Sequence, residues 1–150
     1  AQKTTLRELS ILDANDALLQ RLTTDLTTGT DAVIKSGSLT EDTVAAAMAI
    51  ADIIIHCTPV GMHPNVDETP FEKRYLRQGL VVFDTVYNPE STLLVKEAFQ
   101  HDCKVITGVE MFVRQAARQF FLFTGQEPSG DLLRDTLKRV TGAVKMQTGK

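Results

Sequence analysis

Two apolar runs constrain the fold more than any other feature of the sequence. The runs "DIIIHC", residues 52–57, and "LVVFDTVY", residues 80–87, are rich in β-branched residues and are continuous rather than alternating. This pattern is typical of parallel strands that are covered on both faces. Both runs pass into residues such as Pro and Gly, so each strand is expected to end there at an edge of its sheet.

Shorter strands and helices are predicted around these two runs. Further strands are expected at residues 6–12, 31–35 and 104–108. Helical periodicity is present in five segments, which are residues 15–26, 38–51, 91–102, 110–125 and 130–144. Strands and helices that alternate with short connections predict an α/β fold with a Rossmann-like parallel sheet and flanking helices.

Local signals predict helix starts and buried faces. Ser38, followed three residues later by Glu41, predicts a capping box for the second helix. In the fourth helix Phe112, Phe120 and Phe123 share one face with Ala116, so these phenylalanines are expected in the core rather than around a cofactor.

Composition narrows the class of protein. A chain of 150 residues with 43% hydrophobic and 23% charged residues is expected to form one compact unit. A net charge of −3 and scattered Lys and Arg residues argue against nucleic acid as a partner. No apolar run approaches the ~20 residues that span a membrane, so no membrane partner is expected. Cys57 and Cys103 lack the spacing of a metal site or a disulfide framework, and a reducing cytoplasm is the simplest location.

The chemistry of the chain is expected where its strands end. Ligands of open parallel sheets bind beyond the carboxyl ends of the strands. In this chain those ends are Asp13 and the segments "HCTPVGM", "DTVYNP" and "TGVEM", all of which follow apolar runs. We therefore predict one ligand site at a common edge, formed by residues 56–62, 84–89 and 107–111 with Asp13.

Three motifs carry a resemblance to a known family. The segments "TPVGM", "DTVYNPESTLL" and "GVEMFVRQAARQFFLFTG" stand in the order and spacing of the C-terminal, nucleotide-binding half of shikimate dehydrogenases. These enzymes, and the related quinate dehydrogenases, reduce 3-dehydroshikimate or oxidise the ring alcohol with a nicotinamide cofactor. The resemblance covers residues 51 to about 140, and residues 1–50 fit the family only as strands and helices.

The resemblance implies which residues contact the cofactor. The loop beside the ribose and the nicotinamide would consist of Thr58, Pro59, Val60, Gly61 and Met62, with Gly108 and Met111 flanking the nicotinamide ring. Pro59 and Gly61 allow a sharp turn close to a flat ring, and Met62 offers an adaptable apolar surface. The alternative is that this loop only ends a strand.

The resemblance also implies a substrate side. Tyr87 would present its phenol to the hydroxyls or carboxylate of shikimate, 3-dehydroshikimate or quinate, and Gln115 would bond a substrate hydroxyl. A partly buried Tyr before a capped helix is the alternative. His56 stands where the family usually has Asn, and we assign it no catalytic role. His63 and His101 are expected to be surface residues.

Asp13 bears on whether the cofactor is NAD or NADP. An acidic residue at the end of the second strand of a dinucleotide fold accepts hydrogen bonds from the ribose 2′-OH of NAD, whereas NADP needs a cation there. Relatives that use NADP tend to have Asn-Arg where this chain reads Asp13-Ala14. NAD is favoured, or the preference for NADP is relaxed. A strand-end Asp that forms a turn or a helix cap is equally consistent with the sequence.

Residues 1–50 contain no GxGxxG turn, which would cradle the pyrophosphate. The first strand of the fold, and the N-terminal domain with the Lys and Asp pair of the family, are also not recognised. We therefore expect one portion of a longer dehydrogenase, inactive alone, with a metal-free site that takes NADP or NAD. Its unpaired strand edges predict a homo-oligomer or a swapped assembly. A non-catalytic α/β binding module, or a reductase of another small alcohol, is the alternative.

Overall fold

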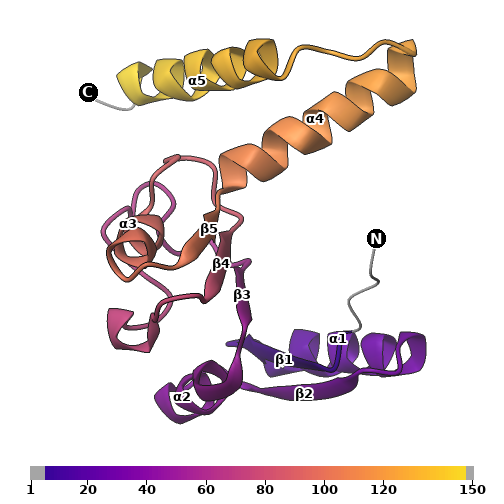
Figure 1. The fold of residues 1–150 in the computed structure, drawn as a ribbon, viewed down its shortest axis with the longest axis vertical. Helices are drawn as coiled ribbons and strands as arrows, with labels where there is room; N and C mark the ends of the chain where they lie inside the picture. Colours follow the sequence, from indigo (N-terminus) through magenta and orange to yellow (C-terminus); the bar gives the residue numbers. More distant parts are fainter. Residues whose placement is uncertain (1–5, 148–150) are drawn as a thin grey trace. The chain divides into compact units, whose positions relative to one another are not determined.

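The computed structural model describes residues 6–147, and the side chains of residues 6–141. The elements follow one another as strands and helices (Figure 1), and their bounds are β1 Glu8–Asp13, α1 Asp16–Gly29, β2 Val33–Ser38, α2 Glu41–Ile50, β3 Ile53–His56, η1 Lys73–Tyr75, β4 Val81–Asp84, α3 Leu93–Gln100, β5 Lys104–Ile106, α4 Gly108–Thr124 and α5 Gly130–Gln147. All strand pairs are parallel. The predicted α/β class, with parallel strands and flanking helices, is confirmed.

The chain divides into two compact units, Ala1–Ala51 and Asp52–Lys150. Length and composition predict one compact unit instead. The difference has a structural basis, because the described strands form a two-stranded sheet, β1-β2, and a separate three-stranded sheet, β3-β4-β5.

In the first unit, β1 and β2 pair in register from Glu8 opposite Val33 to Asp13 opposite Ser38. Asn15 caps α1, since its side chain accepts hydrogen bonds from two backbone N–H groups of the first turn. The buried apolar side chains described in this unit are those of Leu19, Val44 and Met48.

The predicted capping box at Ser38 is wrong. Ser38 is the last residue of β2, and its hydroxyl donates to Asp16 at 2.7 Å. The cap of α2 is Thr40, whose side chain accepts from the backbone N–H of Thr43 while the Thr43 hydroxyl accepts from the N–H of Thr40. A Thr at the third helical position performs the role expected of Glu, because its hydroxyl also reaches back to the cap.

In the second unit, β4 is the central strand of the order β3-β4-β5, and α3 contacts both β4 and β5. The largest of the fully buried side chains described in this unit are those of Val82, Asp84, Thr92 and Leu94. Thr92 caps α3 through the N–H of Val95 at 3.1 Å, so the helix begins at Leu93, two residues after the start of the predicted segment 91–102.

The expectation that β3 is covered on both faces is wrong. Ile53 and Ile55 are 59% and 55% exposed, whereas His56 is buried. Alternate side chains of a strand point to opposite faces, so the two isoleucines share a face that the described residues leave uncovered. Three consecutive isoleucines give no alternation in hydrophobicity from which this difference could be predicted.

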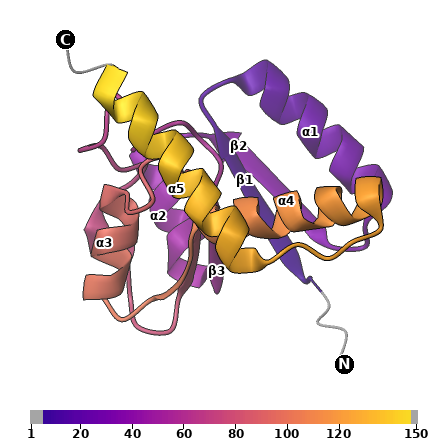
Figure 2. The ribbon, with the colours of Figure 1, turned by 90° about the horizontal axis from the view of Figure 1, so that it is seen from above.

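The helices α4 and α5 pack against each other, and Figure 2 shows α5 crossing the first half of α4. Their contact is formed by Val109, Val113 and Leu137, with Phe112 and Leu133 packed around them. The expectation that all the α4 phenylalanines lie in the core is wrong, since Phe120 is exposed and Phe123 is 88% exposed. The buried face of α4 begins at Val109 and turns away before Phe120.

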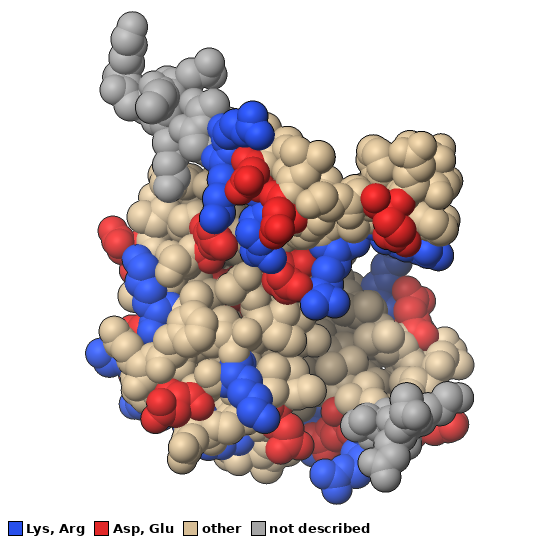
Figure 3. Space-filling view, turned by 45° about the horizontal axis from the view of Figure 1, so that its top comes forward, with Lys and Arg blue, Asp and Glu red and all other residues tan. Residues whose placement is uncertain are grey.

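Within the described residues, no helix combines the length and apolar character that crossing a bilayer requires. On the face drawn in Figure 3, Lys and Arg side chains are interspersed with Asp and Glu side chains.

Candidate functional site

The three strands of the second unit end at the same edge of the sheet. His56 pairs with Asp84, and Phe83 pairs with Ile106, so the segments that follow β3, β4 and β5 leave from neighbouring positions. Parallel strands place their carboxyl ends on the same side. The three predicted motifs therefore begin side by side.

The first motif forms a tight turn. The N–H of Met62 donates to the carbonyl of Pro59 at 3.1 Å, and Gly61 has a φ of 83°. A glycine at the third position with positive φ is typical of a type II turn. A Cβ on Gly61 would lie 3.3 Å from the Glu68 carbonyl and 3.6 Å from Cβ of Thr92, so the turn sits against the start of α3.

The His56 side chain lies beneath this turn and is 4% exposed. Its Nε2 lies 3.0 Å from the carbonyl oxygen of Val60, and its Nδ1 lies 3.5 Å from Oγ1 of Thr58. The N–H of Val60 donates to that same hydroxyl at 3.3 Å. The observed contacts agree with a structural role for His56.

The second motif is held by a buried carboxylate that sequence reasoning missed. Asp84 accepts a hydrogen bond from the Thr92 hydroxyl at 2.6 Å and another from the N–H of Val86 at 2.9 Å. Asp84 thus fixes the path of the chain towards Tyr87 and the cap of α3 together. An acidic residue at the end of an apolar run, followed eight residues later by a Thr before a helix, is the sequence signal for this pair.

The second and third motifs are in direct contact. A Cβ on Gly108 would lie 2.3 Å from the carbonyl oxygen of Val86, so only glycine fits at the start of α4. The ring of Tyr87 packs on that of Phe112 with the centroids 4.9 Å apart. These contacts bring the second motif against the third, as Gly61 and Thr92 bring the first against the second.

The side chains predicted to meet a ligand are mostly open to solvent. Met62 and Tyr87 are 44% and 41% exposed, Gln115 is exposed, and Met111 is half-buried. Among the described residues no hydrogen bond is found for the Tyr87 phenol or for the Gln115 amide, so both groups are available to a ligand. The described part of the chain has no cluster of three or more His, Cys, Asp or Glu residues that could hold a metal ion.

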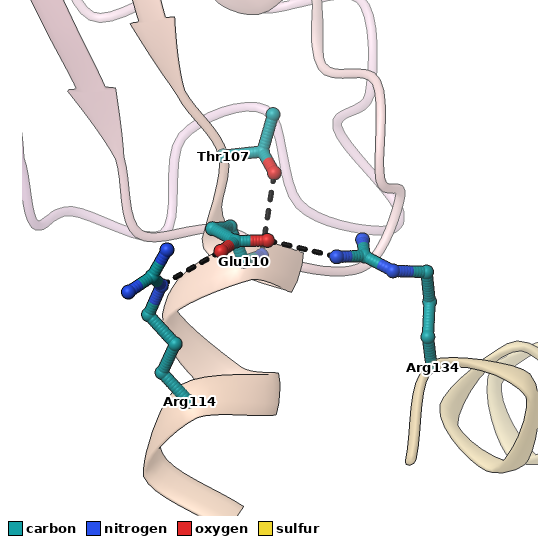
Figure 4. A network of polar contacts seen from close by, with 4 residues as sticks. All are labelled: Thr107, Glu110, Arg114 and Arg134. Carbon is teal, nitrogen blue, oxygen red and sulfur yellow. Dashed lines mark hydrogen bonds and ion pairs between the residues drawn. The ribbon is translucent and has the colours of Figure 1, made fainter. Parts of the chain in front are cut away.

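A charged network stands beside this site on the first turn of α4 (Figure 4). Glu110 accepts hydrogen bonds from Arg134 of α5 at 2.8 Å and from Arg114 at 2.7 Å, and its backbone N–H donates to the cap Thr107. The hydrogen bonds from Arg134 and then Arg114 lower the pKa of the Glu110 carboxyl from its ordinary value. Glu110 thereby links α5 to the helix that carries Gly108, Met111 and Gln115.

Asp13 lies in the first unit, at the predicted carboxyl end of β1. Its Oδ1 accepts from the N–H of Asn15 at 2.8 Å, a turn contact, while Asn15 and not Asp13 caps α1. Asp13 also lines an open cavity of 390 Å³ between β1 and α1, whose other lining residues include Leu18, Arg21 and Leu22. The other candidate residues all belong to the second unit.

The parallel strands, the flanking helices and the loops at the carboxyl ends place the chain in the Rossmann-like class of α/β folds. Within that class, residues 108–138 match the sequence model of the "Shikimate 5'-dehydrogenase C-terminal domain". The resemblance to shikimate dehydrogenases that the three motifs predict is confirmed.

Sequence relatives match a longer part of the chain. The chain is 52% identical over 83 residues, 55% of its length, to the shikimate dehydrogenase (NADP(+)) of Bacillus subtilis. It is 40% identical over 98 residues, 65% of its length, to the enzyme of that name from Methanothermobacter thermautotrophicus. These matches span 30% and 35% of the two relatives, so the chain corresponds to about a third of their length.

Solved structures show the same likeness. A shikimate 5-dehydrogenase of Listeria monocytogenes, in complex with shikimate and NAD, matches with a TM-score of 0.78 at 27% identity, covering 87% of this chain and 47% of that one. A quinate dehydrogenase of Corynebacterium glutamicum, in complex with NAD, matches with a TM-score of 0.76 at 30% identity over 87% of this chain and 45% of that one.

Proposed function

We propose that this chain supplies the nicotinamide-facing and substrate-facing loops of an NAD(P)-dependent shikimate or quinate dehydrogenase. The observation that carries the proposal is the contact between the three motifs at one sheet edge, where Gly61 meets Thr92 and Gly108 meets Val86. Relatives to which this chain is similar are named for that activity. The reaction would be the reversible reduction of 3-dehydroshikimate to shikimate.

The cofactor side of the proposal rests on residues that fit a flat ring. Met62 is exposed on a turn whose backbone Gly61 keeps tight, and Met111 lies half-buried on the first turn of α4 after Gly108. Thioethers pack well against rings because they are flexible and polarisable. The bound nicotinamide supplies or accepts the hydride. Residues 58–62, Gly108 and Met111 bind and orient it.

The substrate side rests on Tyr87 and Gln115. A phenol and an amide with free hydrogen-bonding groups suit the hydroxyls and the carboxylate of a small ring alcohol. The packing of Tyr87 on Phe112 restricts the phenol to a limited range of directions. We therefore assign both residues to orienting the substrate and not to proton transfer.

Asp13 and Arg21 bear on the choice between the two cofactors. Both line the cavity between β1 and α1, whose apolar walls Leu18 and Leu22 suit an adenosine moiety. The carboxylate of Asp13 favours the free 2′-OH of NAD, and the guanidinium of Arg21 is a cation for a 2′-phosphate. We propose that NAD binds at least as well as NADP, and that Asp13→Ala shifts the ratio of affinities towards NADP.

The proposed site contains no acid or base assigned to the proton that accompanies the hydride. We accordingly propose that the 150-residue chain alone shows no turnover of shikimate or quinate. It is expected to bind NAD with a dissociation constant weaker than millimolar, because residues 1–50 provide no glycine-rich cradle for the pyrophosphate.

Methionine methyl groups give a direct test of this proposal. The chain has four methionines, and Met48, in the first unit, is buried in α2 and belongs to none of the predicted loops. With methyl-labelled methionine, addition of NAD is expected to shift the signals of Met62 and Met111, through the ring current of the nicotinamide, while Met48 stays unchanged. Met62→Leu and Met111→Leu assign the signals.

Three results would contradict the proposal. They are a shift of Met48 alone, no saturable shift at any NAD concentration, and a micromolar dissociation constant, which would mean that a pyrophosphate site exists after all. Adding shikimate or quinate to the complex extends the test, since Tyr87→Phe and Gln115→Ala should weaken the response to the alcohol without changing the response to NAD. A response to neither alcohol would favour the non-catalytic binding module.

A further inference from the structure

Among the groups that the proposed chemistry leaves unused, His56 has the most specific surroundings. It is the last residue of β3, it is 4% exposed, and its two ring nitrogens have partners in Thr58 and Val60 of the segment that follows. A buried imidazole with two such partners is fixed in rotation and in tautomer, because each nitrogen can satisfy only one kind of contact in the neutral ring.

The partners determine which nitrogen carries the proton. A carbonyl oxygen only accepts, so the 3.0 Å contact between Nε2 and the Val60 oxygen requires a hydrogen on Nε2. The bare Nδ1 then accepts from the hydroxyl of Thr58, which in turn accepts from the N–H of Val60. The three contacts form a closed ring of hydrogen bonds in which every donor has an acceptor.

These three hydrogen bonds act on the central peptide of the turn. In the turn from Pro59 to Met62, Val60 and Gly61 occupy the two central positions, and type I and type II turns differ by a flip of the peptide between them. The Val60 carbonyl belongs to that peptide. A donor on His56 therefore holds the peptide in the orientation that accompanies the positive φ of Gly61.

We propose that His56, as its Nε2–H tautomer, is a positioning residue that fixes the turn of residues 59–62 and so sets the direction in which Met62 is presented. The backbone of His56 supports the same edge, because its carbonyl accepts from both the N–H and the hydroxyl of Thr85 at the start of the second motif. The inference depends on the proposed function only for the identity of the ligand that the turn meets.

The tautomer and the order of the turn can be measured without any ligand. In the wild-type chain, nitrogen NMR is expected to show hydrogen on Nε2 and none on Nδ1. In His56→Phe the amide of Met62, which closes the turn, should exchange roughly tenfold faster, the factor expected for loss of one hydrogen bond. His56→Gln should restore most of the protection, because its amide can donate to the Val60 carbonyl.

His101 provides the matched control. Its Nδ1 lies 2.9 Å from the carbonyl of Glu97 at the end of α3, so His101→Phe removes a similar contact between a ring and a backbone carbonyl away from the turn. This variant should leave the Met62 amide unchanged. Thr58→Val keeps the Nε2 contact, so it should accelerate the exchange of the Met62 amide less than His56→Phe does. It provides the test if His56→Phe fails to fold.

The methyl shift of Met62 on addition of NAD connects the turn to the ligand. It should weaken several-fold in His56→Phe and remain in His101→Phe. A proton on Nδ1 alone, or equal Met62 exchange in the two Phe variants, would overturn the inference. If the methionine signals of the wild-type chain do not respond to NAD, the proposed function is refuted. The exchange data alone would then decide the role of His56.

Discussion

The two units use the same local elements but bury them to different depths. In the first unit two strands and two helices surround Leu19, Val44 and Met48, each of which keeps a few per cent of its surface exposed. In the second unit the central strand β4 and the cap of α3 contain side chains with almost no exposure, among them Asp84 and Thr92. Depth of burial decides how much a single contact contributes, because a buried polar group has no water to replace a lost partner.

Glycines give the largest expected contrast between the units. Gly108→Ala places a methyl group 2.3 Å from the Val86 carbonyl, which neither backbone can avoid, whereas Gly37→Ala in β2 meets a Thr43 methyl at 3.4 Å, an ordinary contact. We expect Gly108→Ala to lower the free energy of unfolding by about 3 kcal/mol and Gly37→Ala by less than about 1 kcal/mol. Urea titration of both variants measures the difference. Equal losses would contradict the close approach of α4 to the second motif.

Hydrogen exchange compares the two sheets without any mutation. A two-stranded sheet is marginally stable, whereas β4 has a hydrogen-bonded neighbour on each side. We expect the slowest amide of β4 to exchange about a hundredfold more slowly than the slowest amide of β1 or β2, which corresponds to roughly 2.7 kcal/mol. Exchange followed by NMR on the whole chain provides the values. Equal protection would mean that the two units unfold together.

The sequence predicts the strands and helices well and the burial of their side chains less well. The five strands and five helices follow from apolar runs and helical periodicity, and the three motifs lie at a common edge as expected. The exposure of Ile53 and Phe123 was not predictable, because a hydrophobic side chain shows where a strand or helix can pack and not whether a partner is present.

The candidate site shows the same limit. Gly61 and Gly108 are recognisable as motif residues, but only the three-dimensional structure shows that Gly108 is needed because of the Val86 carbonyl. The bond between Asp84 and Thr92 joins residues eight apart through a turn of the chain, and no periodicity reports it. The division into two units also escapes prediction, since strand pairing across a sheet is not local in sequence.

Helix caps offer a finer comparison of the two units. Thr92 and Thr40 both cap a helix through their side chains, but Thr92 is buried and also donates to Asp84, whereas Thr40 is exposed. Thr92→Val should cost about 2 kcal/mol and Thr40→Val about 1 kcal/mol. Chemical denaturation of the two variants tests this order. If the exposed cap costs more, burial is not what makes the second unit sensitive.

The smallest expected effect concerns carboxylates and pH. The folded-state pKa of Glu110 is lowered, first by the hydrogen bond from Arg134, so its contribution to stability is present above its ordinary pKa of 4.5 and is lost as the pH falls through the lower folded value. Glu110→Gln should therefore reduce the difference in unfolding free energy between neutral and acidic solution.

The first unit supplies the counterpart Glu8, which lies 2.9 Å from the single cation Lys35. If Glu8→Gln flattened the pH profile as much as Glu110→Gln does, the two guanidinium groups on Glu110 would have no special effect, and the link between α4 and α5 would rest on Val113 and Leu137 instead.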